Sequence, residues 1–259
     1  GEKAIRWTLD SARATSGGSA AELAETLFTE ALDLMDDDDP RRVGVLLERA
    51  KAAISRLDTP PVRRDLDLAL PLVMASGDQR LVIQHRLIAS ELAQWSSDND
   101  GALRLADEAH QLAIDLGDRS LAAESLRRLG MTRLFRGEHE LAEISINEAH
   151  DIYVELDDPS GVAWIRQNLA WIAYVSGRMG EAEVRLEQAV DAFEELGDLA
   201  GMAWSRGLLA YVRIYAGRFA EADELAKQTL AEARDRGDHW AQGMMPVSYT
   251  HLRAHETSE

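Results

Sequence analysis

The sequence contains no cysteine, which excludes disulfide bonds and thiolate metal sites. Proline is scarce as well, with six residues in 259, and this scarcity favours helices that continue for several turns. No apolar run approaches the roughly 18 residues of a membrane-spanning helix, and no signal peptide opens the chain. We therefore expect a cytoplasmic protein that makes no membrane contact.

Basic residues are also few, because 28 Lys and Arg stand against 46 Asp and Glu. The resulting net charge of −18 repels phosphate backbones, so we expect this segment to bind no nucleic acid. The apolar share of 46% is higher than in disordered chains, and the length is ample for a sizeable core. The composition predicts a folded, helix-rich protein.

The usual catalytic and metal-binding motifs are missing. There is no phosphate-cradling glycine-rich loop, no HExxH and no nucleophile elbow. The acidic run at residues 36–39 lacks the alternating ligands of a calcium loop, and it predicts a solvated turn before Pro40. His110 and His150 lie 40 residues apart, which favours a repeated structural position over a ligand. We expect no enzyme activity, no cofactor and no metal site.

A period of 40 residues organises most of the chain. The segments IDLGD, VELDD, EELGD and RDRGD end on Asp118, Asp158, Asp198 and Asp238. A glycine before such an aspartate suits the left-handed end of one helix, and the aspartate can cap the start of the next helix. A second set of turn residues recurs halfway through each unit, at Gly137, Gly177 and Gly217. Each unit is therefore predicted to be two helices of about 15 to 17 residues joined by short turns.

The predicted helices are amphipathic. Ile165, Leu169, Ile172 and Ala173 follow the spacing of one buried stripe. A helix pair cannot bury both of its faces alone, so neighbouring pairs must stack. The sequence predicts an all-α fold, a right-handed α-solenoid of antiparallel helix pairs.

Small and apolar residues recur at fixed positions of the unit. A Leu-Gly pair at 129–130 becomes Leu-Ala at 169–170 and at 209–210. The second helices share a set of small residues, which are Ala142, Ala149, Ala182, Ala189 and Ala222. Thr229 departs from this set. In these features residues 80–245 resemble the tetratricopeptide repeat family. The 40-residue unit is similar to the long-helix form found in bacterial regulators like the maltose-regulon activator and in ATPase-linked cyclases. The resemblance implies a helical scaffold and leaves the partner open.

Three segments are expected. Residues 1–78 form irregular N-terminal helical repeats and a linker, in which Val43, Leu47 and Ala50 take the apolar positions of a second helix and an extra helix lies between residues 60 and 79. Residues 79–245 form the regular solenoid, with three full repeats and partial ones. The opening resembles the linker that follows the ATPase modules of those regulators, so the N-terminus is expected to be cut.

Residues 246–259 form the third segment. The string VSYTHLRAHET resembles one reading frame of a transposon-end sequencing adapter, so this tail is expected not to be native. His251 and His255 have the spacing of a helical metal pair, but they fall inside the tail. A fifth repeat beginning at HWAQGMM is then severed, and the natural protein is expected to be longer at both ends.

The resemblance also selects candidate binding residues, because the first helix of each pair lines the concave face in such solenoids. The candidates share one helical face per unit and are Arg127, Met131, Trp164, Gln167, Trp171, Tyr174, Trp204, Tyr211 and Tyr215. Aromatic rings beside Arg127 and Gln167 supply the flat apolar area and the orienting donors that a peptide or sugar site needs. The alternative is that the rings pack between adjacent first helices.

The leading hypothesis is a non-enzymatic interaction or sensor arm, a fragment of a larger bacterial signal-transducing ATPase or transcriptional regulator. Its groove would bind a protein or peptide segment, the ATPase or output module of the same parent, or a small-molecule inducer. One alternative is a free-standing adaptor that assembles other proteins. Another is a small-molecule module in which Trp164, Trp171 and Trp204 stack on a sugar.

Overall fold

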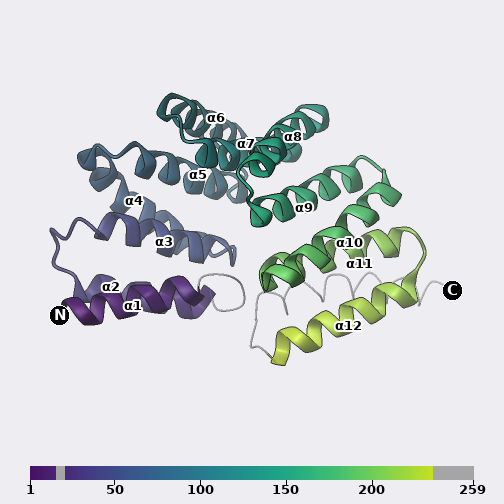
Figure 1. The fold of residues 1–259 in the computed structure, drawn as a ribbon, viewed down its shortest axis with the longest axis horizontal. Coiled ribbons are helices and arrows are strands. Elements are labelled where there is room, and N and C mark those ends of the chain that lie inside the picture. Colours follow the sequence, from purple (N-terminus) through teal and green to yellow (C-terminus); the bar gives the residue numbers. More distant parts are fainter. Residues whose placement is uncertain (16–20, 236–259) are drawn as a thin grey trace. The chain divides into compact units, whose positions relative to one another are not determined.

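The computed structural model describes residues 1–15 and 21–235. Asp238, the predicted start of a fifth repeat, and the adapter-like tail with His251 and His255 lie outside these residues. Within the described ranges the chain is all α-helical and contains no strand (Figure 1). Its twelve helices are α1 (Glu2–Thr15), α2 (Ala21–Leu34), α3 (Arg42–Ile54), α4 (Thr59–Ser76), α5 (Gln79–Trp95), α6 (Asn99–Leu116), α7 (Arg119–Phe135), α8 (His139–Glu155), α9 (Pro159–Val175), α10 (Met179–Leu196), α11 (Leu199–Tyr215) and α12 (Phe219–Asp235).

The predicted period is present in the helix boundaries. The first helices of the four regular pairs, α5, α7, α9 and α11, begin at residues 79, 119, 159 and 199, and each is 17 residues long. The second helices, α6, α8, α10 and α12, begin at residues 99, 139, 179 and 219. The described residues thus contain four complete helix pairs with a 40-residue spacing.

The predicted caps set these boundaries. The carboxylates of Asp118, Asp158 and Asp198 accept hydrogen bonds from the backbone N–H groups three residues later, at 3.1, 2.9 and 2.9 Å. Each bond satisfies one of the donors that a helix start leaves unpaired. Gly117, one residue before the first of these caps, has φ +72°, the left-handed conformation that glycine adopts without steric cost. The predicted turn chemistry is confirmed at these positions.

The helices belong to two compact units, residues 1–156 and residues 157–235 among those described. In the first unit α5 packs against α6 and α7, and α7 packs against α8. In the second unit α9 packs against α10 and α11, and α11 packs against α12. Each first helix therefore contacts its own second helix and, within a unit, the next first helix. This is the stacking that a solenoid of helix pairs requires.

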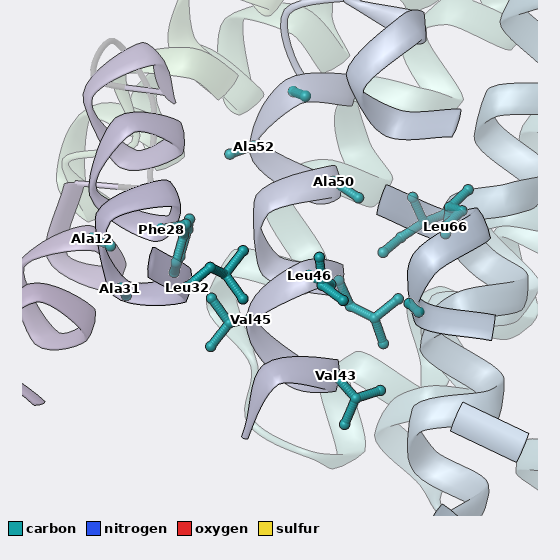
Figure 2. Close-up of a cluster of buried hydrophobic side chains, with 14 of the residues drawn as sticks. Ala12, Phe28, Ala31, Leu32, Val43, Val45, Leu46, Ala50, Ala52 and Leu66 are labelled. Atoms are coloured by element: carbon teal, nitrogen blue, oxygen red, sulfur yellow. The ribbon is translucent and has the colours of Figure 1, made fainter. Parts of the chain in front are cut away.

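The N-terminal helices of the first unit share one apolar core. Figure 2 shows Phe28 and Leu32 of α2 beside Val45 of α3, while Leu46 points toward Leu66 of α4 on the opposite side of α3. The apolar positions predicted for α3, Val43, Leu47 and Ala50, are all buried. Helix α3 is therefore buried on two sides.

The predicted extra helix is α4, and a buried ion pair holds it to α3. The Nε and Nη2 groups of Arg49 donate to the two carboxylate oxygens of Asp65, both at 2.7 Å. The Nη1 group of Arg49 donates to the Thr29 hydroxyl of α2 at 3.0 Å. The Asp65 side chain is fully buried, so the pair lies in the core and orders three helices together.

The small residues of the repeat lie where two helices approach closely. Ala142, Ala149, Ala182, Ala189 and Ala222 have no exposed surface. Thr229, which departs from this pattern, is also buried, and its hydroxyl donates to the Leu225 carbonyl at 2.8 Å. This local hydrogen bond satisfies the polar group inside the core.

The Leu-Gly pair of one repeat becomes Leu-Ala in the next because the side chain that faces the second residue of the pair differs in shape. A Cβ atom added at Gly130 would lie 2.6 Å from Cγ1 of Ile146, so only glycine fits there. The equivalent position in the second unit is Ala170, which packs in one cluster with Leu186. Leucine branches one carbon further from the backbone than isoleucine, and this leaves room for the alanine methyl group.

Candidate functional site

Helices α9 and α11 carry an aromatic face, which we define as Trp171, Tyr174, Trp204, Tyr211 and Tyr215. Trp171 and Trp204 lie with ring centroids 5.9 Å apart and planes tilted by 34°. Tyr174 and Tyr215 form an edge-to-face pair at 5.8 Å with an interplanar angle of 62°. Both pairs join α9 to α11, so the rings contact each other across the two first helices.

The aromatic face is partly open to solvent. Tyr215 is 65% exposed, and the other four rings are partly exposed. Burial raises the pKa of Tyr174 to about 12, and a hydrogen bond with Tyr215 adds to the shift. The Tyr174 phenol therefore stays neutral over the physiological pH range and can act as a hydrogen-bond donor or acceptor.

The helices that carry this face have no acidic residue. Neither α9 nor α11 contains Asp or Glu, whereas α10 alone contains six. Arg206 of α11 pairs with Glu232 of α12 at 2.6 Å, and Arg213 of α11 pairs with Glu187 of α10 at 3.2 Å. The two arginines of α11 are thus neutralised by the second helices, the five rings carry no formal charge of their own, and α9 adds one partly exposed arginine, Arg166.

Of two further candidate residues of α9, Gln167 lies in the core and Trp164 is partly buried against it. The Trp164 ring packs edge to face on the buried Phe193 of α10, with centroids 5.0 Å apart. Gln167 is only 2% exposed, and its Oε1 accepts a hydrogen bond from Asn168 Nδ2 at 2.7 Å. The alternative of the sequence analysis, rings that pack between adjacent first helices, instead describes the contacts of Trp171 with Trp204 and of Tyr174 with Tyr215, because both pairs join α9 to α11.

The remaining candidates, Arg127 and Met131, lie on α7 in the first unit. Met131 is buried, whereas Arg127 is partly exposed and makes no ion pair with any described residue. At the ends of α5 and α7, Trp95 and Phe135 form an edge-to-face pair at 5.9 Å. This unit therefore has an arginine and one aromatic pair, and the second unit has the larger aromatic set.

The acidic run at residues 36–39 is the predicted inter-helix turn. The backbone N–H of Arg41 donates to Asp39 Oδ1 at 2.9 Å, and the Arg41 guanidinium holds the pKa of Asp39 at about 2.

No group of three metal-ligating side chains occurs in the described part of the chain. In that same part, no helix has both the length and the apolarity that a bilayer crossing needs.

The sequence analysis assigned no role to one exposed apolar surface, on α4. Leu68, Leu70, Leu72 and Met74 are 51, 39, 38 and 63% exposed. The signal was present in the sequence, because residues 68–75 contain no polar side chain over two helical turns. These residues precede the 40-residue repeat, which begins only at residue 79.

Comparison with known sequences and structures identifies the fold. No protein-family model matches the chain, and no characterised protein sequence matches it. A solved structure of a signal transduction ATPase with a tetratricopeptide repeat sensor, from Pyrococcus horikoshii, matches 95% of this chain at 17% identity with a TM-score of 0.60. The match covers 38% of that ATPase, so this chain corresponds to well under half of its length.

Two further solved structures are similar. Aspartyl phosphate phosphatase F from Bacillus subtilis matches 94% of this chain and 78% of its own at 12% identity, with a TM-score of 0.64. The Rap conjugation gene regulator of the plasmid pLS20, solved in complex with the Phr* peptide, matches 86% of this chain and 62% of its own at 15% identity, with a TM-score of 0.54. At these identities the likeness establishes the fold alone, which is an all-α solenoid of tetratricopeptide-like helix pairs.

Proposed function

We propose that this chain is a non-catalytic protein-interaction module whose aromatic face binds an extended peptide segment. The observation that carries the proposal is the pairing of Trp171 with Trp204 and of Tyr174 with Tyr215 on the partly exposed side of α9 and α11. Aromatic side chains provide a large, rigid contact area at low cost in conformational entropy, and they dominate peptide and protein interfaces.

The charge distribution specifies the kind of peptide. The aromatic face is neutral, while the chain as a whole carries a net charge of −18 and α10 contributes six acidic residues. A peptide with apolar or aromatic side chains at its centre meets no unpaired charge on the face, and acidic flanks would be repelled by the surrounding carboxylates. The phenol groups can bond to peptide carbonyl and N–H groups.

The similarity to the Rap conjugation gene regulator in complex with a peptide supports this proposal at the level of fold. A sugar-like inducer is the weaker candidate for the same face. That alternative needs Trp164 as a third stacking platform, and the partly exposed Trp164 ring already contacts Phe193 of α10. The peptide hypothesis needs only the five rings of the aromatic face.

The test begins with a random peptide library selected on the intact chain, followed by calorimetry with the enriched peptides. Replacing Tyr215, the most exposed ring of the aromatic face, by alanine is expected to raise the peptide Kd about 30-fold, which corresponds to a hot-spot loss of about 2 kcal/mol. Trp7→Ala is the matched control, because Trp7 is an equally exposed ring of the first unit, 68% exposed on α1. Its replacement is expected to leave the Kd unchanged. Selection of no peptide, or equal losses in both variants, would contradict the proposal.

We further propose that the module is the sensor arm of a larger signal-transducing ATPase. The support is the match to an ATPase with a tetratricopeptide repeat sensor, which covers most of this chain and a minor part of that protein. Peptide binding would then shift the parent protein from one conformational state to another, which requires that the peptide bind the two states with different affinities. Sequencing the source DNA across both ends is expected to reveal an in-frame P-loop upstream of Gly1. A start codon and a stop codon that closely bracket the repeat would instead identify a free-standing adaptor.

A further inference from the structure

The exposed side of α4 is apolar over two turns. Val62, Leu66, Ala69 and Val73 fill the core side of the helix. On the other side Leu68, Leu72 and Met74 are exposed, and no polar side chain occurs between residues 68 and 75. A helix that is apolar on all sides is normally buried on all sides. The outer side of α4 therefore has the composition of an interface.

The outer side has the spacing of a helix-packing stripe. Arg64, Leu68, Pro71 and Ala75 of α4 follow one another at intervals of four, three and four residues. Such intervals keep side chains on one face of a helix and are typical of seams between two helices. Beyond the stripe, the left-handed Gly77 ends α4, and Asp78 next to it is the N-cap of α5.

The stripe is positive at its first end and negative at its last. Arg63 and Arg64 are exposed near the start of α4; Arg64 also contacts the buried Asp65 at 3.3 Å, and Arg63 makes no ion pair with any described residue, so this end stays net positive beside the exposed Asp67. At the other end lie the carbonyl groups of the helix C-terminus and the Asp78 carboxylate, and both favour a cation. Such a surface is complementary to itself when a second copy runs antiparallel.

We propose that α4 is the interface of a homodimer in which two copies of this helix pack antiparallel. A two-fold axis at Pro71 places Arg64 of one copy at the C-terminal end of α4 of the other, where the helix carbonyl groups and Asp78 lie, and Leu68 opposite the region of Met74 and Ala75. The same patch of each subunit then forms the contact, as two-fold symmetry requires. The apolar turns between residues 68 and 75 lose water on both sides, and the charged ends select the antiparallel orientation.

The first experiment compares the intact chain with the double variant Leu68→Glu, Leu72→Glu by sedimentation at micromolar concentrations. The wild-type chain is expected to sediment as a dimer, and the variant as a monomer with unchanged helical circular dichroism. Both side chains are exposed in the single copy, so the substitutions leave the core intact. A wild-type chain that is monomeric across this range overturns the proposal, and so does a variant that remains dimeric.

The second experiment tests the register and uses the absence of cysteine from the chain. A single cysteine at the two-fold axis, Pro71→Cys, is expected to form a disulfide-linked dimer on mild oxidation. Ser120→Cys, exposed on α7, is the matched control and is expected to stay unlinked. Equal cross-linking of both variants, or none at Pro71→Cys, overturns the antiparallel arrangement.

Discussion

Replacing Asp65 by alanine is expected to lower the free energy of unfolding of the first unit by about 3–5 kcal/mol, because the substitution leaves the buried Arg49 guanidinium without its carboxylate. Asp65 accepts two hydrogen bonds of 2.7 Å from that guanidinium and is fully buried. Urea unfolding followed by circular dichroism measures the change. Hydrogen exchange of the α3 and α4 amides localises it, because a repeat chain need not unfold in one step.

Two controls separate the ion pair from the helix that carries it. Asp67→Ala removes an exposed carboxylate two residues along α4 and is expected to change the stability by about 0.5 kcal/mol or less. The double variant Arg49→Met, Asp65→Leu replaces the pair by apolar side chains and is expected to be more stable than Asp65→Ala. If Asp65→Ala costs no more than Asp67→Ala, the pair does not hold α4 in place.

Replacing Phe193 by alanine is expected to destabilise the second unit by about 3–5 kcal/mol, because the truncation leaves a cavity in a closely packed core. Phe193 has no exposed surface, and its ring supports Trp164 at 5.0 Å. Tryptophan fluorescence during urea unfolding reports on this region, since three tryptophans of the described chain lie in the second unit, on α9 and α11. The expected first sign is a shifted emission spectrum of the folded variant.

The repeat itself provides the control for this prediction. A Cβ atom at Gly201 would lie 2.4 Å from Cε1 of Phe193, so the large ring and the glycine fit each other. In the first unit the equivalent positions hold Ala113 and Leu121, which pack in one cluster. Adding Gly201→Leu to Phe193→Ala is therefore expected to recover part of the lost stability, whereas Gly201→Leu alone disrupts the core. If the changes in unfolding free energy of the two substitutions simply add, the sizes of the side chains at positions 193 and 201 are not coupled.

The periodic part of the fold could be predicted because local signals and burial agree at every repeat. The aspartate caps, the left-handed glycine at 117 and the small residues on the second helices are each decided within a few residues of sequence. Their spacing of 40 residues then determined the helix boundaries from residue 79 onward. The stacking of pairs followed because an isolated pair cannot bury its apolar faces.

The candidate site could be predicted only in part. The aromatic side chains of α9 and α11 were identified from one helical face, and five of them form the proposed peptide site. Sequence spacing cannot tell whether a ring points to solvent or to a neighbouring helix, because this depends on the size of the facing residue. The Trp164 ring contacts Phe193 of α10 and stays partly exposed, whereas Gln167 became buried beside Asn168.

The sequence by itself determined an all-α chain of helix pairs with a 40-residue period, a large negative charge and no thiol chemistry. Only the tertiary structure decided that Arg49 and Asp65 form a buried pair, because residues on different helices meet according to packing and not according to spacing. It also decided which apolar side chains remain uncovered, on the aromatic face and on α4. Exposure is a property of the assembled helices, since each helix buries only the side that its neighbours cover.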